Sequence, residues 1–145
     1  MPDRPDRYAP FRPHRGPAVA WVVGAVALAG ALVLATATPG LTAPDRLGFA
    51  VVGLAVAWFM QRQATVRAVP DASGLLVRNL VVSRRLEWAE VVAVHFGGGR
   101  PWVQLDLSDG DTLAVMGIQR ADGPRAEAEA RRLATLVAQH GPQRG

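Results

Sequence analysis

Hydrophobic and polar positions divide the chain into two parts with different patterns. Residues 18 to 60 form a nearly continuous apolar stretch, in which Asp45 and Arg46 are the charged residues. After residue 63 the pattern changes to short runs of alternating apolar and polar residues, separated by turn residues. Long uncharged runs are typical of helices in lipid, and alternation is typical of strands with one buried face. The sequence therefore predicts a membrane-embedded half followed by a small β-rich domain.

Two segments of the apolar half are predicted to be transmembrane helices. Residues 18–38 carry no charge, and a helix of 21 residues is roughly 31 Å long, which matches the hydrocarbon core of a bilayer. Residues 39–46 form the predicted extracytoplasmic loop. The second helix, predicted at residues 47–61, has an apolar run of 14 residues, roughly 21 Å in helical form, which also suits a core helix or a re-entrant segment. Because this segment has no polar face, we expect it to span the membrane.

Arginines near the two segments predict the orientation of the chain. Four arginines precede the first segment and two follow the second, whereas the connecting loop contains Arg46 alone. Because positive residues are retained on the cytoplasmic side, we expect a multi-pass protein of the cell membrane with both termini in the cytoplasm. The alternative is a cleaved signal peptide, since an Arg-rich stretch, an apolar run and Ala35-Thr36-Ala37 follow one another. The second segment would then still return the chain to the cell interior.

Residues 1–17 are rich in proline and arginine. Proline interrupts helices and removes backbone donors, and arginine gives the segment no apolar face. The pattern predicts a flexible cytoplasmic tail.

Residues 64–141 show the pattern of one small α+β domain. Strands are predicted near residues 65–69, 75–79, 82–88, 92–96, 102–108, 113–115 and 116–118. Val92, Val94 and Phe96 are predicted to point inward, and Arg84 is the one charged residue on an inward face. A final helix is predicted to begin with Asp122 as its N-cap and to bury Ala126, Ala130, Leu133 and Val137. Six or seven antiparallel strands and this capping helix predict a β-barrel or sandwich.

This pattern resembles the bacterial pleckstrin-homology-like proteins of the low molecular weight protein antigen 6 type, which are common in actinobacteria. The resemblance covers residues 65–139 and the two apolar segments. It is carried by residues 74–79, 85–91, 105–113 and 116–122, among which the corner Trp88-x-Glu90-Val91 is the most specific. The resemblance implies a pleckstrin-homology (PH)-like fold with a membrane tether, and it implies no catalytic residue.

Motifs for catalysis or metal binding find little support in the sequence. His14, His95 and His140 are far apart, and cysteine is absent, so neither a histidine cluster nor a thiolate metal site is predicted. The run Gly97-Gly98-Gly99-Arg100 lacks the Lys-Ser/Thr ending of a phosphate-binding loop. Asp106, Asp109 and Asp111 lack the glutamate that completes a calcium loop. We therefore expect no enzyme activity, no cofactor and no metal.

Four arginines of the β-rich domain are the candidate ligand-binding residues: Arg78, Arg84, Arg85 and Arg100. Arginines in loops at the open end of a barrel can hold anionic headgroups, although they are also common on solvated strand faces. The net charge of +4 is small, and because several arginines flank the apolar segments, nucleic acid is not an expected partner. The leading hypothesis is a membrane-tethered module that binds a protein or peptide at the inner leaflet. The alternative is sensing of anionic lipid by the arginine-bearing loops.

Overall fold

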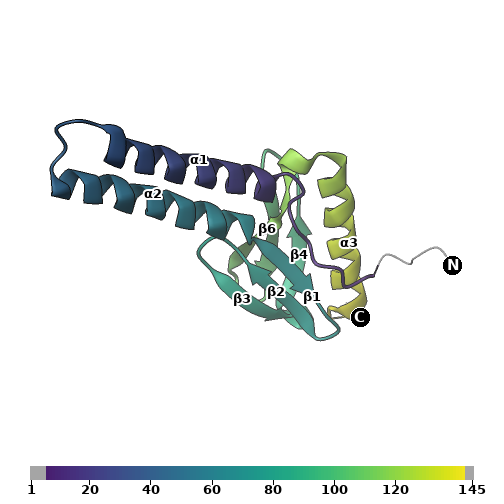
Figure 1. The fold of residues 1–145 in the computed structure, drawn as a ribbon. Helices are drawn as coiled ribbons and strands as arrows, with labels where there is room; N and C mark the ends of the chain where they lie inside the picture. The colour runs from purple at the N-terminus through teal and green to yellow at the C-terminus, as the bar shows by residue number, and fades with distance from the viewer. Residues whose placement is uncertain (1–5, 143–145) are drawn as a thin grey trace. The chain divides into compact units, whose positions relative to one another are not determined.

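The computed structural model describes residues 6–142 (Figure 1). Its elements form two compact units. One unit is residues 15–65, and the other combines residues 6–14 with residues 66–142. The second unit therefore combines the β-rich part of the chain with a segment from before the first helix.

The first unit consists of two α-helices of 22 residues each, α1 (Gly16–Ala37) and α2 (Ala43–Ala64). Helix α2 begins before the apolar run because Thr42 and Asp45 form a capping box. The Thr42 backbone N–H donates to the Asp45 carboxylate at 2.9 Å, and the Asp45 N–H donates to the Thr42 hydroxyl at 3.4 Å. A 22-residue helix is roughly 33 Å long, so both helices have the length and composition to cross a membrane.

Small residues form the contact between the two helices, and large apolar side chains point away from it. Ala20, Gly24 and Ala35 of α1 and Gly53 of α2 are buried. The exposed set is Val19, Trp21, Val22, Val23, Val26, Leu32, Val33, Leu34, Leu47, Val51, Val52, Leu54, Trp58 and Phe59. The Arg46 guanidinium donates to the Ala35 carbonyl at 2.6 Å and so satisfies a backbone group near the end of α1. Close packing through small residues is typical of helices in lipid.

Replacing Gly53 by leucine is expected to separate the two helices, because a Cβ atom at this position would lie 2.5 Å from the Ala31 Cβ. Overpacking of this kind typically costs about 1–3 kcal/mol. Gly48→Leu is the matched control, since a Cβ there meets nothing within 4 Å. Thermal unfolding in detergent, followed by circular dichroism, should show a lower midpoint for G53L and an unchanged midpoint for G48L. Equal midpoints would contradict close contact between α1 and α2 at Gly53.

The second unit contains six strands, two 3₁₀ turns and one helix among its described residues. Strands β1 (Arg67–Pro70), β2 (Gly74–Arg78) and β3 (Ser83–Glu87) form one antiparallel sheet in that order. Strands β4 (Val91–His95), β5 (Trp102–Leu107) and β6 (Thr112–Gln119) form the other. The turn η1 (Trp88–Glu90) joins the sheets, and η2 (Arg120–Asp122) leads into helix α3 (Pro124–His140). The α+β prediction is confirmed, with the last two predicted strands merged into β6.

One hydrophobic core lies between the two sheets and α3. The sheets contribute Leu75, Val77, Leu86, Val91, Val103, Leu105, Leu107, Val115 and Ile118, and α3 contributes Ala126, Ala130, Leu133 and Leu136. The predicted helix stripe is confirmed at Ala126, Ala130 and Leu133, while Val137 is partly buried against the same core. The core is therefore closed by the helix at one side of the sheets, as the sequence pattern predicts.

Two local predictions are wrong. Val92 is exposed, because the pairing of β4 with β5 shifts between Val91 and Ala93 and places Val91 and Val94 on the inner face. A bulge of one residue reverses the direction of every side chain before it. The N-cap of α3 is Gly123, and Asp122 instead lies in η2, where its carboxylate accepts a hydrogen bond from the His14 backbone N–H at 3.0 Å.

Candidate functional site

Residues 6–14, which we call the N-terminal strap, belong to the second unit and lie next to β1 and α3 (Figure 1). Phe11 and Ala68 exchange two backbone hydrogen bonds, of 2.8 and 3.0 Å, as an antiparallel bridge. The Phe11 side chain is completely buried in the domain core. The prediction of a flexible tail is therefore wrong for residues 6–14, because an aromatic residue in this polar segment fills the core. Residues 1–5 lie outside the described residues.

Arg132 of α3 holds the strap from the outside. Its guanidinium carbon lies 3.8 Å from the centre of the Phe11 ring, a cation–π contact. The same guanidinium donates to the Ala9 carbonyl at 2.9 Å and to the Arg7 carbonyl at 3.2 Å. An ion pair with Glu129, at 2.7 Å, keeps it in place. One side chain thus satisfies two strap carbonyls and covers the buried ring.

An aromatic stack joins the strap to the C-terminal end of α3. The Tyr8 hydroxyl lies 3.0 Å from His140 Nε2, and the His140 ring stacks on Trp88 with ring centres 5.5 Å apart. The Trp88 indole N–H donates to the Asp71 carbonyl at 2.9 Å. The corner that carries the family resemblance therefore has a structural role. Its glutamate contributes too, because the Glu90 carboxylate accepts a hydrogen bond of 2.7 Å from the Glu87 backbone.

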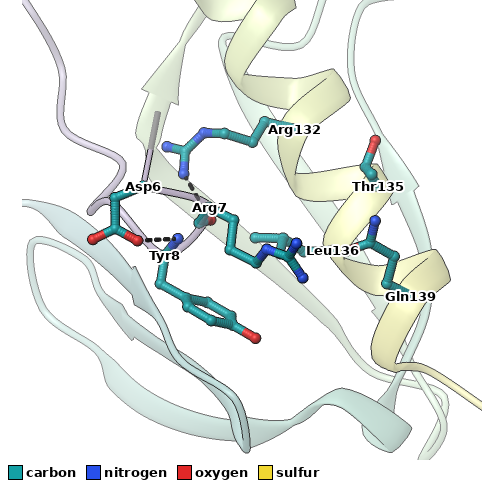
Figure 2. A pocket seen from close by; sticks show the side chains of 7 residues that line it. All are labelled: Asp6, Arg7, Tyr8, Arg132, Thr135, Leu136 and Gln139. Carbon is teal, nitrogen blue, oxygen red and sulfur yellow. Dashed lines mark hydrogen bonds between the residues drawn. The ribbon is translucent and has the colours of Figure 1, made fainter. Parts of the chain in front are cut away.

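An open pocket of about 720 Å³ lies between the strap and α3 (Figure 2). Its lining residues are Asp6, Arg7, Tyr8, Arg132, Thr135, Leu136 and Gln139. Two of its charged groups are engaged in the strap itself, because Asp6 accepts from the Tyr8 backbone N–H and Arg132 donates to the Arg7 carbonyl. The Tyr8 and Thr135 hydroxyls also have partners, in His140 and in the Arg131 carbonyl. The pocket therefore lies beside the contact between the strap and α3, and Arg7 is its remaining charged side chain.

A second hollow runs between α3 and the edge strand β4, and we call it the α3–β4 groove. Two adjoining pockets, of about 470 and 530 Å³, share Val94 and Ala134 and together make up the groove. Its apolar lining is Val91, Val92, Ala93, Val94, Phe96, Ala130, Ala134, Val137 and Ala138, and charged Arg120, Glu127 and Arg131 lie at one end. Strand β4 has β5 as its partner on one side and is the edge of its sheet. The bulge leaves Val92 47% exposed at this edge.

Arg84, the charged residue predicted on an inward face, forms a structural ion-pair network. Its guanidinium lies 3.0 Å from the Asp109 carboxylate, 3.9 Å from Glu90 and 4.0 Å from Asp111. The hydrogen bond to Asp109 raises the pKa of Arg84, and the Asp111 backbone N–H together with Arg84 lowers the pKa of Asp109. Arg84 thereby links β3 of one sheet to the β5–β6 turn of the other.

The other three predicted arginines lie in separate places. Arg85 pairs with Asp71 at 2.7 Å in the β1–β2 turn, where hydrogen bonds from Ser73 and then Arg85 hold the Asp71 pKa well below its ordinary value. Arg100 donates to the Gln104 amide oxygen at 2.9 Å. Arg78 lies on the outer face of β2, directly opposite Arg67 of β1. The structure thus does not gather the four candidates into one site.

His95 and Asp106 form a pair on the outer face of the second sheet. His95 Nε2 lies 2.6 Å from the Asp106 carboxylate, with both side chains nearly half exposed. His95 points away from Val94 and Phe96, as predicted. Within residues 6–142, no group of three or more histidine and acidic side chains has the geometry to hold a metal ion. The pair is an isolated contact on a solvated strand face.

Sequence reasoning missed the strap, the α3–β4 groove and Arg67. The strap carried one signal, since Tyr8 and Phe11 are aromatic residues in an otherwise polar, proline-rich segment. The α3–β4 groove had no signal in the sequence, because the exposure of Val92 depends on the bulge in β4. Arg67 is one of the two arginines that follow the second apolar segment, and its place opposite Arg78 follows from strand register alone.

Comparison with known proteins agrees with this architecture. Residues 65–135 match the family described as the bacterial PH domain. Uncharacterised proteins of Mycobacterium tuberculosis and Mycobacterium bovis are 34% identical over 138 residues, which cover 91% of this chain and 90% of each relative. No solved structure matches the chain. The relatives align along nearly their whole length, so the similarity takes in the two apolar helices as well as the β-rich domain. The chain belongs to the bacterial PH domain family.

Proposed function

We propose that this chain is a membrane-tethered, non-catalytic interaction module at the cytoplasmic face of the cell membrane, where its α3–β4 groove binds an extended apolar peptide of a protein partner. The observation that carries this proposal is the edge of β4 beside an apolar helix face, with Val92 exposed between them. Edge strands bind extended peptides by main-chain hydrogen bonds, while side-chain pockets select the sequence. Tethering raises the local concentration of partners on the same membrane.

The side chains of α1 and α2 support the membrane tether. Their large apolar residues face outward and their small residues face inward, so the hairpin buries little apolar surface by itself. In water this arrangement would leave an exposed apolar surface far larger than soluble monomers carry. In a bilayer the same side chains contact lipid, and the two helices satisfy their backbone groups internally.

The strap supports a hairpin that crosses the membrane twice. The strap ends two residues before α1 begins at Gly16, and β1 begins at Arg67, three residues after α2 ends at Ala64. Both ends of the hairpin therefore join the same folded domain. A single crossing would place Phe11 and its partner Ala68 on opposite sides of the bilayer, whereas two crossings return them to one side. The arginines that flank the helices favour the cytoplasm as that side.

The strap also argues against the signal-peptide alternative. Cleavage after Ala37 would remove residues 1–37 and with them Phe11, which is completely buried in the core. Loss of a buried phenylalanine side chain typically costs about 3–5 kcal/mol, a large share of the stability of a small domain. We therefore propose that the first apolar segment is retained as α1.

The groove is tested with random peptides displayed on phage and the full-length protein in lipid nanodiscs. We expect the selected peptides to alternate apolar residues, because an added strand presents every second side chain to the groove. Ala134→Glu places a charge on the exposed groove floor and is expected to weaken binding of a selected peptide at least about tenfold, which corresponds to 1.4 kcal/mol. The matched control is Ala128→Glu, at another exposed position of α3 outside the groove lining. Unchanged binding by A134E would overturn the assignment of the groove.

A further inference from the structure

The turn between β2 and β3 has an unusual composition. Residues 79–82, Asn-Leu-Val-Val, form a tight turn in which the Asn79 backbone N–H donates to the Val82 carbonyl at 2.9 Å. Turns on a protein surface are dominated by Gly, Pro, Asn, Asp and Ser. Here Val81 is 80% exposed and Val82 is 53% exposed. The tip of this turn, which we call the valine turn, therefore presents branched apolar side chains to its surroundings.

Buried hydrogen bonds fix the valine turn in this position. The Asn79 side chain is buried, its amide donates to the Ala114 carbonyl at 2.7 Å, and its oxygen accepts from the Met116 backbone N–H at 3.1 Å. These bonds tie the base of the turn to β6 of the other sheet. The valines consequently cannot fold back onto the core without breaking two hydrogen bonds of a buried polar group.

Two arginines lie side by side at the base of the valine turn. Arg67 and Arg78 are directly opposite each other in the pairing of β1 with β2, on the face away from the core. Like charges at such a pair are destabilising. The Arg67 Nε is buried with no hydrogen-bond partner, and neither arginine forms an ion pair with a described carboxylate. A negatively charged group that reaches the terminal guanidinium nitrogens of this pair would offset the repulsion between the two arginines.

Chain connectivity relates this end of the sheet to the hairpin. Arg67 follows the last residue of α2, Ala64, by three residues, so their Cα atoms are at most about 11 Å apart. The register places Arg67 opposite Arg78, so the valine turn lies at the end of the sheet where the chain arrives from α2. The β1–β2 turn, with Ala72, lies at the other end.

We propose that the valine turn inserts Val81 and Val82 into the interface of the bilayer that holds α1 and α2, while Arg67 and Arg78 bind the phosphate of an anionic lipid headgroup. This rests on the membrane tether of the proposed function and adds a second contact with the same membrane. Apolar side chains next to cations are the usual composition of surfaces that lie in a membrane interface. Arg84, Arg85 and Arg100 are excluded from this site, because their guanidinium groups are held by Asp109, Asp71 and Gln104.

The test uses single cysteines, which the natural sequence lacks. Val81→Cys and the control Ala72→Cys, at exposed turns of opposite sheet ends, are labelled with an environment-sensitive fluorophore in the full-length protein. Each is reconstituted into nanodiscs of phosphatidylcholine alone or mixed with phosphatidylglycerol, with brominated lipid as the quencher. We expect blue-shifted emission and at least about twofold stronger quenching at residue 81 than at residue 72. Phosphatidylglycerol should increase the quenching at residue 81, and R67Q/R78Q in the same background should remove that increase.

Equal, water-like emission at residues 81 and 72 in both lipids would overturn the insertion. An unchanged response to phosphatidylglycerol in R67Q/R78Q would overturn the headgroup site. Inorganic phosphate, added to phosphatidylcholine nanodiscs, should leave the signal at residue 81 unchanged, and a response equal to that of phosphatidylglycerol would contradict lipid as the ligand. Co-purification with the nanodisc reports on the tether separately. Failure to integrate would count against the proposed function, whereas integration with residue 81 in water would count against this inference alone.

Discussion

Replacing Phe11 by alanine is expected to lower the free energy of unfolding of the PH-like domain by about 3–5 kcal/mol, although Phe11 is separated from that domain in sequence by two helices. The Phe11 ring is completely buried, and the substitution would leave a cavity beneath Arg132. Denaturant unfolding in detergent measures the change, followed by tryptophan fluorescence in a background in which Trp21 and Trp58 are replaced by phenylalanine, so that Trp88 and Trp102 report. A loss of this size is a large fraction of the stability of a small domain.

Arg12→Ala is the matched control for this substitution, because Arg12 is the exposed neighbour of Phe11 in the strap. Surface substitutions usually change stability by no more than about 0.5 kcal/mol. We therefore expect R12A to unfold like the natural protein. If F11A and R12A had the same unfolding midpoint, the strap would not be part of the domain core.

Replacing Gly117 of β6 by valine is expected to displace the strap by a steric clash with its backbone at Phe11. A Cβ at Gly117 would lie 2.6 Å from the Phe11 carbonyl oxygen and 3.1 Å from the Ala68 backbone nitrogen. Those two backbones form the bridge that holds the strap, so a branched side chain cannot fit while the bridge is closed. We expect a loss of at least about 1–3 kcal/mol, as is typical of overpacking, and faster hydrogen exchange of the Phe11 amide.

Thr112→Val is the control for Gly117→Val, because Thr112 lies exposed at the start of the same strand, β6. In T112V, the backbone amides of β6 and of the strap should keep the hydrogen-exchange rates of the natural protein. The double variant F11A/G117V offers a sharper comparison. Because both changes act on one contact, the double variant should lose less free energy of unfolding than the two single variants lose together. Full additivity would contradict a shared joint at Phe11 and Gly117.

Periodic features of this chain could be predicted from the sequence because each depends on neighbours along the chain. Two long apolar runs and the alternation of strands predicted the helical hairpin and the α+β domain, and helical spacing predicted Ala126, Ala130 and Leu133 as core residues. The start of α2 was harder to predict, because the capping box at Thr42 and Asp45 extends the helix before its apolar run. Local pattern therefore gave the elements more reliably than their ends.

The strap and the bulge could not be predicted, because both depend on contacts that pattern does not record. Phe11 is placed by Ala68 and Arg132, which lie far away in sequence, and a short proline-rich segment has no period of its own. The bulge at β4 moves Val92 outward without any turn residue to mark it.

The candidate arginines show a related limit of sequence reasoning. Sequence shows which residues carry charge, but it does not show which charges are already paired. Arg84 and Arg85 looked available as ligands and are held by Asp109 and Asp71. Arg67 drew attention only for its place next to a membrane segment, and the register then placed it opposite Arg78. Strand register and ion pairing thus decide which cations remain for a ligand.

We propose that the strap and the PH-like domain lie on the same side of the membrane, joined by a hairpin that crosses it twice. Labelling of single cysteines in intact cells with a membrane-impermeant maleimide tests it most directly. The positions are Arg12→Cys in the strap, Pro39→Cys between the helices and Ser108→Cys in the domain, all exposed. We expect residue 39 to be labelled in intact cells, and residues 12 and 108 to be labelled only after the membrane is opened. Labelling of residue 12 and residue 108 from opposite sides would contradict it.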